Sequence, residues 1–142
     1  MRSVFNVGSM FRSGDGAGLQ HIYLCGISPT PEHPAIDKTA LGAQHTVPWS
    51  QHNDGARLAQ TLRGQGKRLW ALEGVADATP LFDAAAERPV NEELVLVLGH
   101  EVTGIDPGIL EHCERCVYIP MRGHKDSLNV ATAMGIAAYA LC

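Results

Sequence analysis

Residues 94–101 read LVLVLGHE, an apolar run followed by a glycine and an acid. Its first five residues, Leu94–Leu98, are all apolar, which is typical of a strand buried on both faces of a parallel sheet. Gly99 follows at once, where a glycine lets the backbone approach a ligand closely. A buried strand that ends in a glycine turn therefore predicts a ligand loop at the carboxyl end of the strand.

Residues 106–141 contain a second predicted strand followed by a glycine-bearing loop. Asp106 and Pro107 predict the start of a helix, since an acid caps the first turn and proline fits the first helical position. Cys116–Ile119 is the next predicted strand, and a glycine-bearing loop at residues 120–126 leads into a long helix over Ser127–Leu141. Two loops thus leave the carboxyl ends of two parallel strands, the usual ligand position in an open α/β sheet.

The rest of the chain alternates strands with helices. Extended segments are predicted at His21–Cys25, Thr46–Trp49 and Arg68–Leu72, and helical segments after Asn6 and at Lys38–Gly42, Asn53–Gln65 and Leu81–Ala86. The first helix is expected to begin at an Asn6 cap and to stop in the glycine-rich stretch Gly14–Gly18. This alternation predicts one α/β domain over residues 1–142, with a mostly parallel sheet flanked by helices on both faces.

Composition narrows the class of protein. The 142 residues are 45% hydrophobic and 18% charged, which is ordinary for a soluble globular protein. No apolar run approaches the roughly 20 residues needed to span a membrane, and residues 1–6 lack a secretory signal, so a cytoplasmic protein is expected. The net charge of −4 argues against a sequence-blind nucleic-acid binder. A basic cluster at residues 57–68 is either a local RNA patch or a solvated helix face.

Cysteine and histidine spacing argues against a metal. Cys113 and Cys116 have C-x-x-C spacing, but they fall where a helix ends, and no second ligand pair exists for zinc. Two half-buried thiols are therefore expected there. The seven histidines show no metal-ligand spacing, and Gly14–Gly18 lacks the order of a dinucleotide-binding loop.

Three segments, in order and character, resemble the motifs of the SpoU methyltransferases. Residues 6–12 (NVGSMFR) resemble the first motif, N-x-G-x-x-x-R. Residues 96–101 (LVLGHE) resemble the second, a strand ending in G-x-E. Ile119–Met121 and residues 127–131 (SLNVA) resemble the third, I-P-M followed by S-L-N-V. Each motif alone is weak, but together they span essentially the whole chain.

This resemblance implies a fold and an activity. The implied fold ends in a deep C-terminal trefoil knot, a feature that periodicity does not show. The implied activity is methylation of a ribose 2′-hydroxyl in tRNA or rRNA by a homodimer that uses S-adenosylmethionine, with RNA rather than DNA or a membrane as partner. The family usually has a strand before the first motif, and its absence here leaves open whether the true N-terminus lies upstream of Met1.

The resemblance also assigns roles to residues. The predicted catalytic residues are Arg12, Glu101, Ser127 and Asn129. The predicted cofactor-binding residues are Leu98, Gly99, Glu101, Ile119, Met121, Ser127 and Leu128. The predicted RNA-binding residues are Asn6, Arg12, Arg122 and Lys125. Because arginine stays protonated, we favour phosphate binding and alkoxide stabilisation for Arg12, with its proton role open. Ser127 either caps the last helix and also touches substrate, or only caps the helix. Glu101 either orients Arg12, hydrogen-bonds the RNA or the cofactor, or is a solvated loop acid.

Two other functions stay open. One is a non-catalytic RNA-binding or assembly protein that keeps the fold, and the other is a small-molecule methyltransferase, which suits the acidic charge balance but not the motif set. A small-residue face at Ala131, Gly135 and Ala138 is expected to pack inside the knot or across a dimer. The sequence identifies neither the RNA and nucleotide nor an accessory partner.

Overall fold

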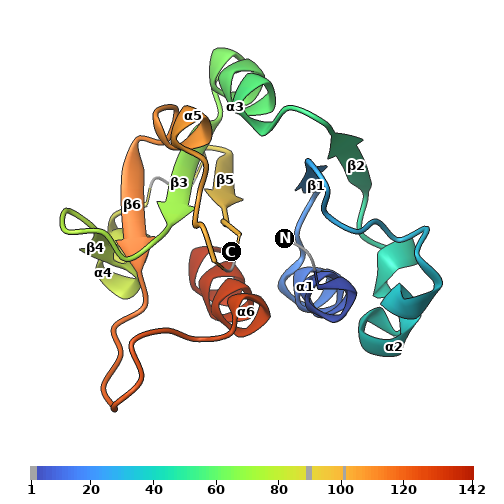
Figure 1. The fold of residues 1–142 in the computed structure, drawn as a ribbon. Helices are drawn as coiled ribbons and strands as arrows, with labels where there is room; N and C mark the ends of the chain where they lie inside the picture. Colours follow the sequence, from blue (N-terminus) through green and yellow to red (C-terminus); the bar gives the residue numbers. More distant parts are fainter. Residues whose placement is uncertain (1–2, 89–90, 101) are drawn as a thin grey trace. The chain divides into compact units, whose positions relative to one another are not determined.

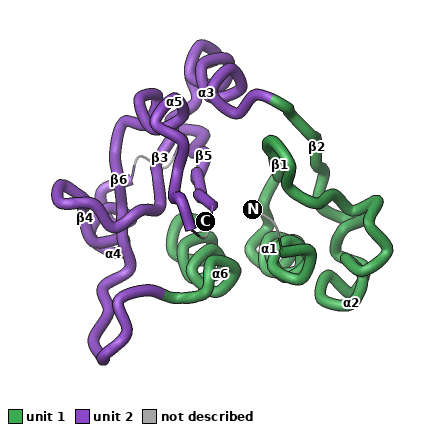
Figure 2. Tube along the Cα trace, viewed as in Figure 1, with its two compact units in different colours: residues 1–53, 128–142 green, residues 54–127 purple. Residues whose placement is uncertain are grey.

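The computed structural model describes residues 3–88, 91–100 and 102–142. The chain divides into two compact units, one of residues 1–53 with 128–142 and the other of residues 54–127 (Figure 2). The described strands form two sheets, of two and four strands, in which every pair is parallel. The expected α/β class is therefore confirmed, whereas the single sheet expected from the sequence is replaced by one sheet in each unit.

The first unit surrounds helix α1. Its elements are α1 (Val4–Ala17), β1 (Ile22–Cys25), the 3₁₀ turn η1 (Pro34–Ile36), α2 (Asp37–Ala40), the 3₁₀ turn η2 (Ala43–His45), β2 (Trp49–His52) and α6 (Val130–Leu141). Helix α1 lies between α2 and α6 (Figure 1). Val7 and Phe11 of α1 are fully buried together with Ile36 and Ala40, so the apolar side of α1 forms the core of this unit.

The second unit is built on a four-stranded sheet. Its elements are α3 (Gly55–Gly64), β3 (Arg68–Leu72), β4 (Thr79–Pro80), α4 (Leu81–Glu87), β5 (Leu94–Val97), α5 (Pro107–Leu110) and β6 (Arg115–Tyr118). The strand order is β4-β6-β3-β5, which places β3 between β6 and β5 (Figure 1). The central strand carries the buried run Leu69, Trp70 and Ala71, as expected for a strand covered on both faces. The prediction that the run at residues 94–98 is buried on both faces is wrong, because β5 is an edge strand whose four residues are all partly exposed. The two-residue strand β4 was not predicted, and its proline is tolerated because β4 is an edge strand.

Helix α1 differs from its predicted start, whereas its end lies within the glycine-rich stretch predicted to stop it. The prediction that Asn6 caps it is wrong, because the hydroxyl of Ser3 accepts from the Asn6 N–H at 3.2 Å and the helix begins at Val4. The helix also continues through Gly14 and Gly16 and ends only at Gly18, whose φ of 78° terminates it. A Cβ on Gly16 would lie 2.5 Å from Tyr139 Oη. The Tyr139 side chain of α6 therefore lies beside Gly16, a helical position at which intrinsic propensity disfavours glycine.

Helix α6 begins three residues later than predicted. Its cap is Asn129, whose Oδ1 accepts from Ala131 N at 2.9 Å and from Thr132 N at 3.3 Å, so Ser127 does not cap the helix. The small-residue face of α6 contacts α1 of the same chain, since a Cβ on Gly135 would lie 3.3 Å from Ser13 Oγ. The other limits shift less, except that the extended segment expected at Thr46–Trp49 begins only at Trp49, as β2.

No helix among the described residues is long and apolar enough to cross a membrane.

Candidate functional site

The carboxyl ends of β3, β5 and β6 meet at one edge of the larger sheet. In this parallel register Ala71 is paired with Val97, and Leu72 with Val117. The loops that follow β5 and β6 carry the second and third motifs, so the two motif loops flank the end of β3 on either side. This edge is where ligands bind in open α/β sheets.

The loop after β5 folds back on itself. His100 and Gly104 exchange backbone hydrogen bonds of 3.1 and 3.0 Å. Nδ1 of His100 accepts from Val102 N at 3.0 Å, so the imidazole closes the turn. A Cβ on Gly99 would overlap the Gly104 backbone and lie 2.5 Å from Ile105 N. Gly99 is therefore required by the loop's own packing, a reason that the sequence did not reveal.

The predicted cofactor residues of the second unit lie at this edge. Leu98 and Gly99 follow β5, and Ile119 and Met121 follow β6; all four are partly buried. They offer apolar surface and backbone groups, which suits a neutral adenine better than a phosphate. Glu101, predicted for both the catalytic and the cofactor set, lies outside the described residues.

The exposed segment after Met121 carries the remaining predicted residues of this unit. Arg122, Lys125 and Ser127 are all exposed there. None of the three has a hydrogen bond or ion pair within the part of the chain that the structure describes. Two cations free of acidic partners are available to an anion, as an RNA-binding role requires.

In the first unit the structure joins the first motif to the third. Nδ2 of Asn129 donates to Oδ1 of Asn6 at 3.2 Å, although the two residues are 123 positions apart in the chain. Leu128, just before Asn129, is 37% exposed. Arg12 is exposed in the middle of α1 rather than at a helix end, about 120° around the helix axis from Asn6 at 3.6 residues per turn.

The motif residue Gly8 also has a structural reason. A Cβ at this position would overlap Thr39 Oγ1 and would lie 2.7 Å from the Ile36 carbonyl oxygen. Since Ile36 and Thr39 belong to η1 and α2, Gly8 permits close contact between α1 and this neighbouring segment. Helix packing by itself therefore accounts for the glycine of the first motif.

The C-x-x-C cysteines are not redox-poised. Burial raises the pKa of the Cys113 thiol to about 11, and the nearby Cys116 and Glu73 add to the shift. Burial likewise raises the pKa of Cys116, with Glu73 and Asp77 contributing. Both thiols are thus protonated at neutral pH, as expected for structural cysteines. No metal-binding group of histidine, cysteine and acidic residues occurs among the described residues.

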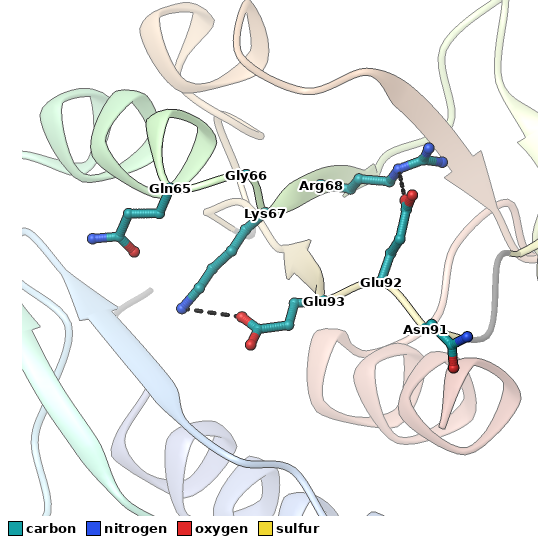
Figure 3. A pocket seen from close by; sticks show the side chains of 7 residues that line it. All are labelled: Gln65, Gly66, Lys67, Arg68, Asn91, Glu92 and Glu93. Atoms are coloured by element: carbon teal, nitrogen blue, oxygen red, sulfur yellow. Dashed lines mark ion pairs between the residues drawn. The ribbon is translucent and has the colours of Figure 1, made fainter.

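A separate cavity of about 600 Å³ lies at the opposite, amino end of β3 and β5 (Figure 3). Its cations are matched by acids: Lys67 Nζ lies 3.4 Å from Glu93 Oε2, and Arg68 pairs with Glu92. This pairing favours a solvated surface over an RNA-binding patch for the basic cluster at residues 57–68. The cavity lies at the end of the sheet opposite the motif loops, so it is not part of the predicted cofactor site.

Sequence reasoning missed Glu73. It comes directly after β3, between the two motif loops, and its Oε1 accepts from Ile105 N at 3.3 Å. The available signal was an acid immediately following the buried strand Arg68–Leu72.

The fold and these loops define the class of α/β proteins whose ligands bind where parallel strands end. Residues 1–139 match the SpoU rRNA Methylase family, and the chain belongs to that family. It is 32% identical over 135 residues to the 23S rRNA (guanosine-2′-O-)-methyltransferase RlmB of Vibrio parahaemolyticus, across 94% of this chain and 52% of that protein. It is 29% identical over 138 residues to the 23S rRNA (guanosine(2553)-2′-O)-methyltransferase RlmP of Bacillus subtilis, across 96% of this chain and 52% of that protein.

A solved structure shares the fold. An AdoMet-bound rRNA methyltransferase from Sinorhizobium meliloti superposes with a TM-score of 0.88 at 24% identity, over 99% of this chain and 52% of the other. This chain spans about half the length of the curated relatives that it matches. The resemblance to the SpoU methyltransferases is confirmed at the level of the family and of an α/β fold with parallel sheets flanked by helices.

Proposed function

We propose that this chain transfers a methyl group from S-adenosylmethionine to a ribose 2′-hydroxyl of RNA. The single observation that carries the proposal is the Asn129–Asn6 hydrogen bond, which joins the first motif to the third within a chain of this family. The names of the relatives favour ribosomal RNA and a guanosine over tRNA. An RNA substrate also favours the cytoplasm.

The residues at the sheet edge fit the cofactor. Leu98, Ile119 and Met121 offer partly buried apolar surface for an adenosyl group, and the backbone after β5 and β6 offers hydrogen bonds. When bound, S-adenosylmethionine supplies an electrophilic methyl group on a sulfonium. Gly99, Glu101, Ser127 and Leu128 complete the proposed cofactor set.

The chain's own residues position and stabilise the acceptor oxygen. Arg12 is exposed and has no partner among the described residues, so its guanidinium is available to hold RNA phosphate. It would also stabilise negative charge on the 2′-oxygen as that oxygen loses its proton to solvent and takes the methyl group, with S-adenosylhomocysteine as the leaving group. Asn129 uses Oδ1 for the α6 cap and one N–H for Asn6, which leaves its second N–H for substrate or cofactor. Glu101 and Ser127 remain in the proposed catalytic set.

The RNA-binding set remains Asn6, Arg12, Arg122 and Lys125. Arg122 and Lys125 are exposed and free of acidic partners in the described part of the chain, so they meet the phosphate backbone without first breaking an ion pair. Asn6 is held by Asn129, which fixes the direction of its amide.

Two further features belong to the proposal. Residues 1–142 form one SpoU-type domain with a C-terminal trefoil knot, as the family implies. The protein acts as a homodimer. The small-residue face of α6 contacts α1 of its own chain, so it does not support a dimer. The dimer is supported instead by exposed apolar side chains of the first unit, such as Phe5, which is 50% exposed, and Tyr139, which is 62% exposed.

Two measurements test the proposal. Calorimetry with S-adenosylhomocysteine should show one site per chain, and an absence of heat at millimolar ligand would reject the cofactor and the enzyme together. Mapping of 2′-O-methyl groups in total RNA from a deletion strain should reveal a lost modification that the wild-type gene restores. An unchanged map alongside intact cofactor binding would favour the non-catalytic RNA-binding protein.

A further inference from the structure

Glu73 occupies a central place at the proposed cofactor edge. It extends β3 by one residue, and its N–H donates to the Val117 carbonyl oxygen at 3.0 Å, which continues the pairing with β6. The register with β5 places it level with Gly99. A carboxylate therefore stands between the loop of the second motif and the loop of the third.

The carboxylate is tied to only one of these loops. Oε1 of Glu73 accepts from Ile105 N at 3.3 Å. It also lies against Gly104, where a Cβ would come within 2.5 Å of Oε1, and the Gly104 φ of 75° already favours glycine. Within the described residues, Oε2 makes no hydrogen bond or ion pair. The backbone that returns from the His100–Gly104 bridge is thus held by the Glu73 carboxylate as well as by the burial of the Ile105 side chain.

The pKa values of two nearby thiols, Cys113 and Cys116, are consistent with this position of the Glu73 carboxylate. The negative charge of Glu73 adds to burial in raising the pKa of both Cys113 and Cys116. The carboxylate is only partly buried, and it has no ion-pair partner among the described residues. A charged acceptor forms a stronger hydrogen bond to a backbone N–H than a neutral one does.

We infer that Glu73 is a positioning residue, which holds the return of the β5 loop at Gly104 and Ile105 and thereby fixes the loop at Leu98 and Gly99 for the cofactor. The inference rests on the proposed function, because the loop is assigned to the cofactor there. Without the hydrogen bond from Ile105 to Glu73, the β5 loop would become ordered only when the cofactor binds. The entropic cost of that ordering would lower the affinity for the cofactor. The position requires a hydrogen-bond acceptor for Ile105 N, and the carboxylate charge strengthens that bond.

The test compares three variants of the full chain. Glu73→Ala removes the acceptor, Glu73→Gln keeps a neutral acceptor, and Asp77→Ala removes a charge from an exposed residue of the same connection between β3 and β4. Amide hydrogen exchange at Gly104 and Ile105 reports the loop, and calorimetry with S-adenosylhomocysteine reports the cofactor site. Thermal melts confirm that each variant is folded.

The expected results separate the roles. Glu73→Ala should speed exchange at Ile105 and raise the Kd for S-adenosylhomocysteine about tenfold, the size of effect typical when a hydrogen bond to a charged group is lost. Glu73→Gln should restore most of both properties, and Asp77→Ala should change neither. If Glu73→Ala does not fold, slow Ile105 exchange and near-normal affinity in Glu73→Gln still support the inference.

Two results would overturn it. One is a Glu73→Gln protein that binds as weakly as Glu73→Ala while its Ile105 exchange stays slow, since the charge would then act on the ligand directly. The other is unchanged exchange in Glu73→Ala. If the wild-type protein binds no S-adenosylhomocysteine, the proposed function fails, yet the exchange comparison still decides whether Glu73 holds the loop.

Discussion

Replacement of Gly8 by alanine tests the claim that this motif glycine serves helix packing. The added Cβ would overlap Thr39 Oγ1 and lie 2.7 Å from the Ile36 carbonyl oxygen. Overpacking of this kind costs about 1–3 kcal/mol. Thr39 must also give up its 2.9 Å hydrogen bond to the Phe5 carbonyl oxygen, at about 1 kcal/mol, which offsets the gain of about 1 kcal/mol from alanine's helix propensity. The expected net loss in the free energy of unfolding is about 1–3 kcal/mol.

Urea denaturation and thermal melts measure this loss, and Tm should fall by roughly 3–9 °C. Gly64→Ala is the matched control, because Gly64 also lies in a helix and an added Cβ there meets nothing within 4 Å. That variant should gain about 0.4–1 kcal/mol or stay neutral. In the Gly8→Ala/Thr39→Ala double variant, removal of the overlapping hydroxyl should make the loss smaller than the sum of the single losses. A Gly8→Ala protein as stable as wild type would refute the packing account.

Three further predictions concern chemistry and assembly. Arg12→Ala should lower methyl transfer by roughly 10²–10³-fold with little change in S-adenosylhomocysteine affinity or Tm. Arg12→Lys should restore only part of the activity, because lysine lacks the planar guanidinium. Arg63→Ala, which changes an exposed residue of α3, is the control, and full activity in Arg12→Ala would rule out a catalytic role. Because the pKa of Cys113 is raised to about 11, its alkylation by iodoacetamide in the folded protein should quicken about tenfold per pH unit up to that pH, whereas a plateau near pH 9 would show an ordinary thiol. Light scattering at micromolar concentration should give twice the chain mass, and a stable monomer would contradict the proposed dimer.

Local patterns predicted much of the second unit. The apolar runs that became β3 and β5 and the Asp106–Pro107 start of α5 were recovered to within a residue, because apolar runs and proline-led helices have strong local signals, although β5 is partly exposed rather than buried. The starts of α1 and α6 were missed, since Ser3 and Asn129 compete with other residues that are equally able to cap a helix. Which residue caps depends on tertiary contacts such as Asn129–Asn6.

The site was predicted through resemblance more than through pattern. Motif matching identified Asn6 and Asn129, and the structure adds the contact between them. Glu73 carries no motif, and its role depends on a loop that reaches it from 32 residues away. Gly8 and Gly99 were assigned to the motifs, but the reason for each is a backbone that approaches from another segment, which no local pattern encodes.

The central claim is methyl transfer to a ribose, and one measurement addresses it directly. The purified chain is incubated with tritium-labelled S-adenosylmethionine and total RNA from the deletion strain, and the RNA is digested to nucleosides and separated. The account predicts label in a 2′-O-methylnucleoside with the wild-type protein and the Arg63→Ala control, and its near loss with Arg12→Ala. A wild-type protein that binds S-adenosylhomocysteine yet leaves every nucleoside unlabelled, or that labels a base instead of a ribose, would contradict it.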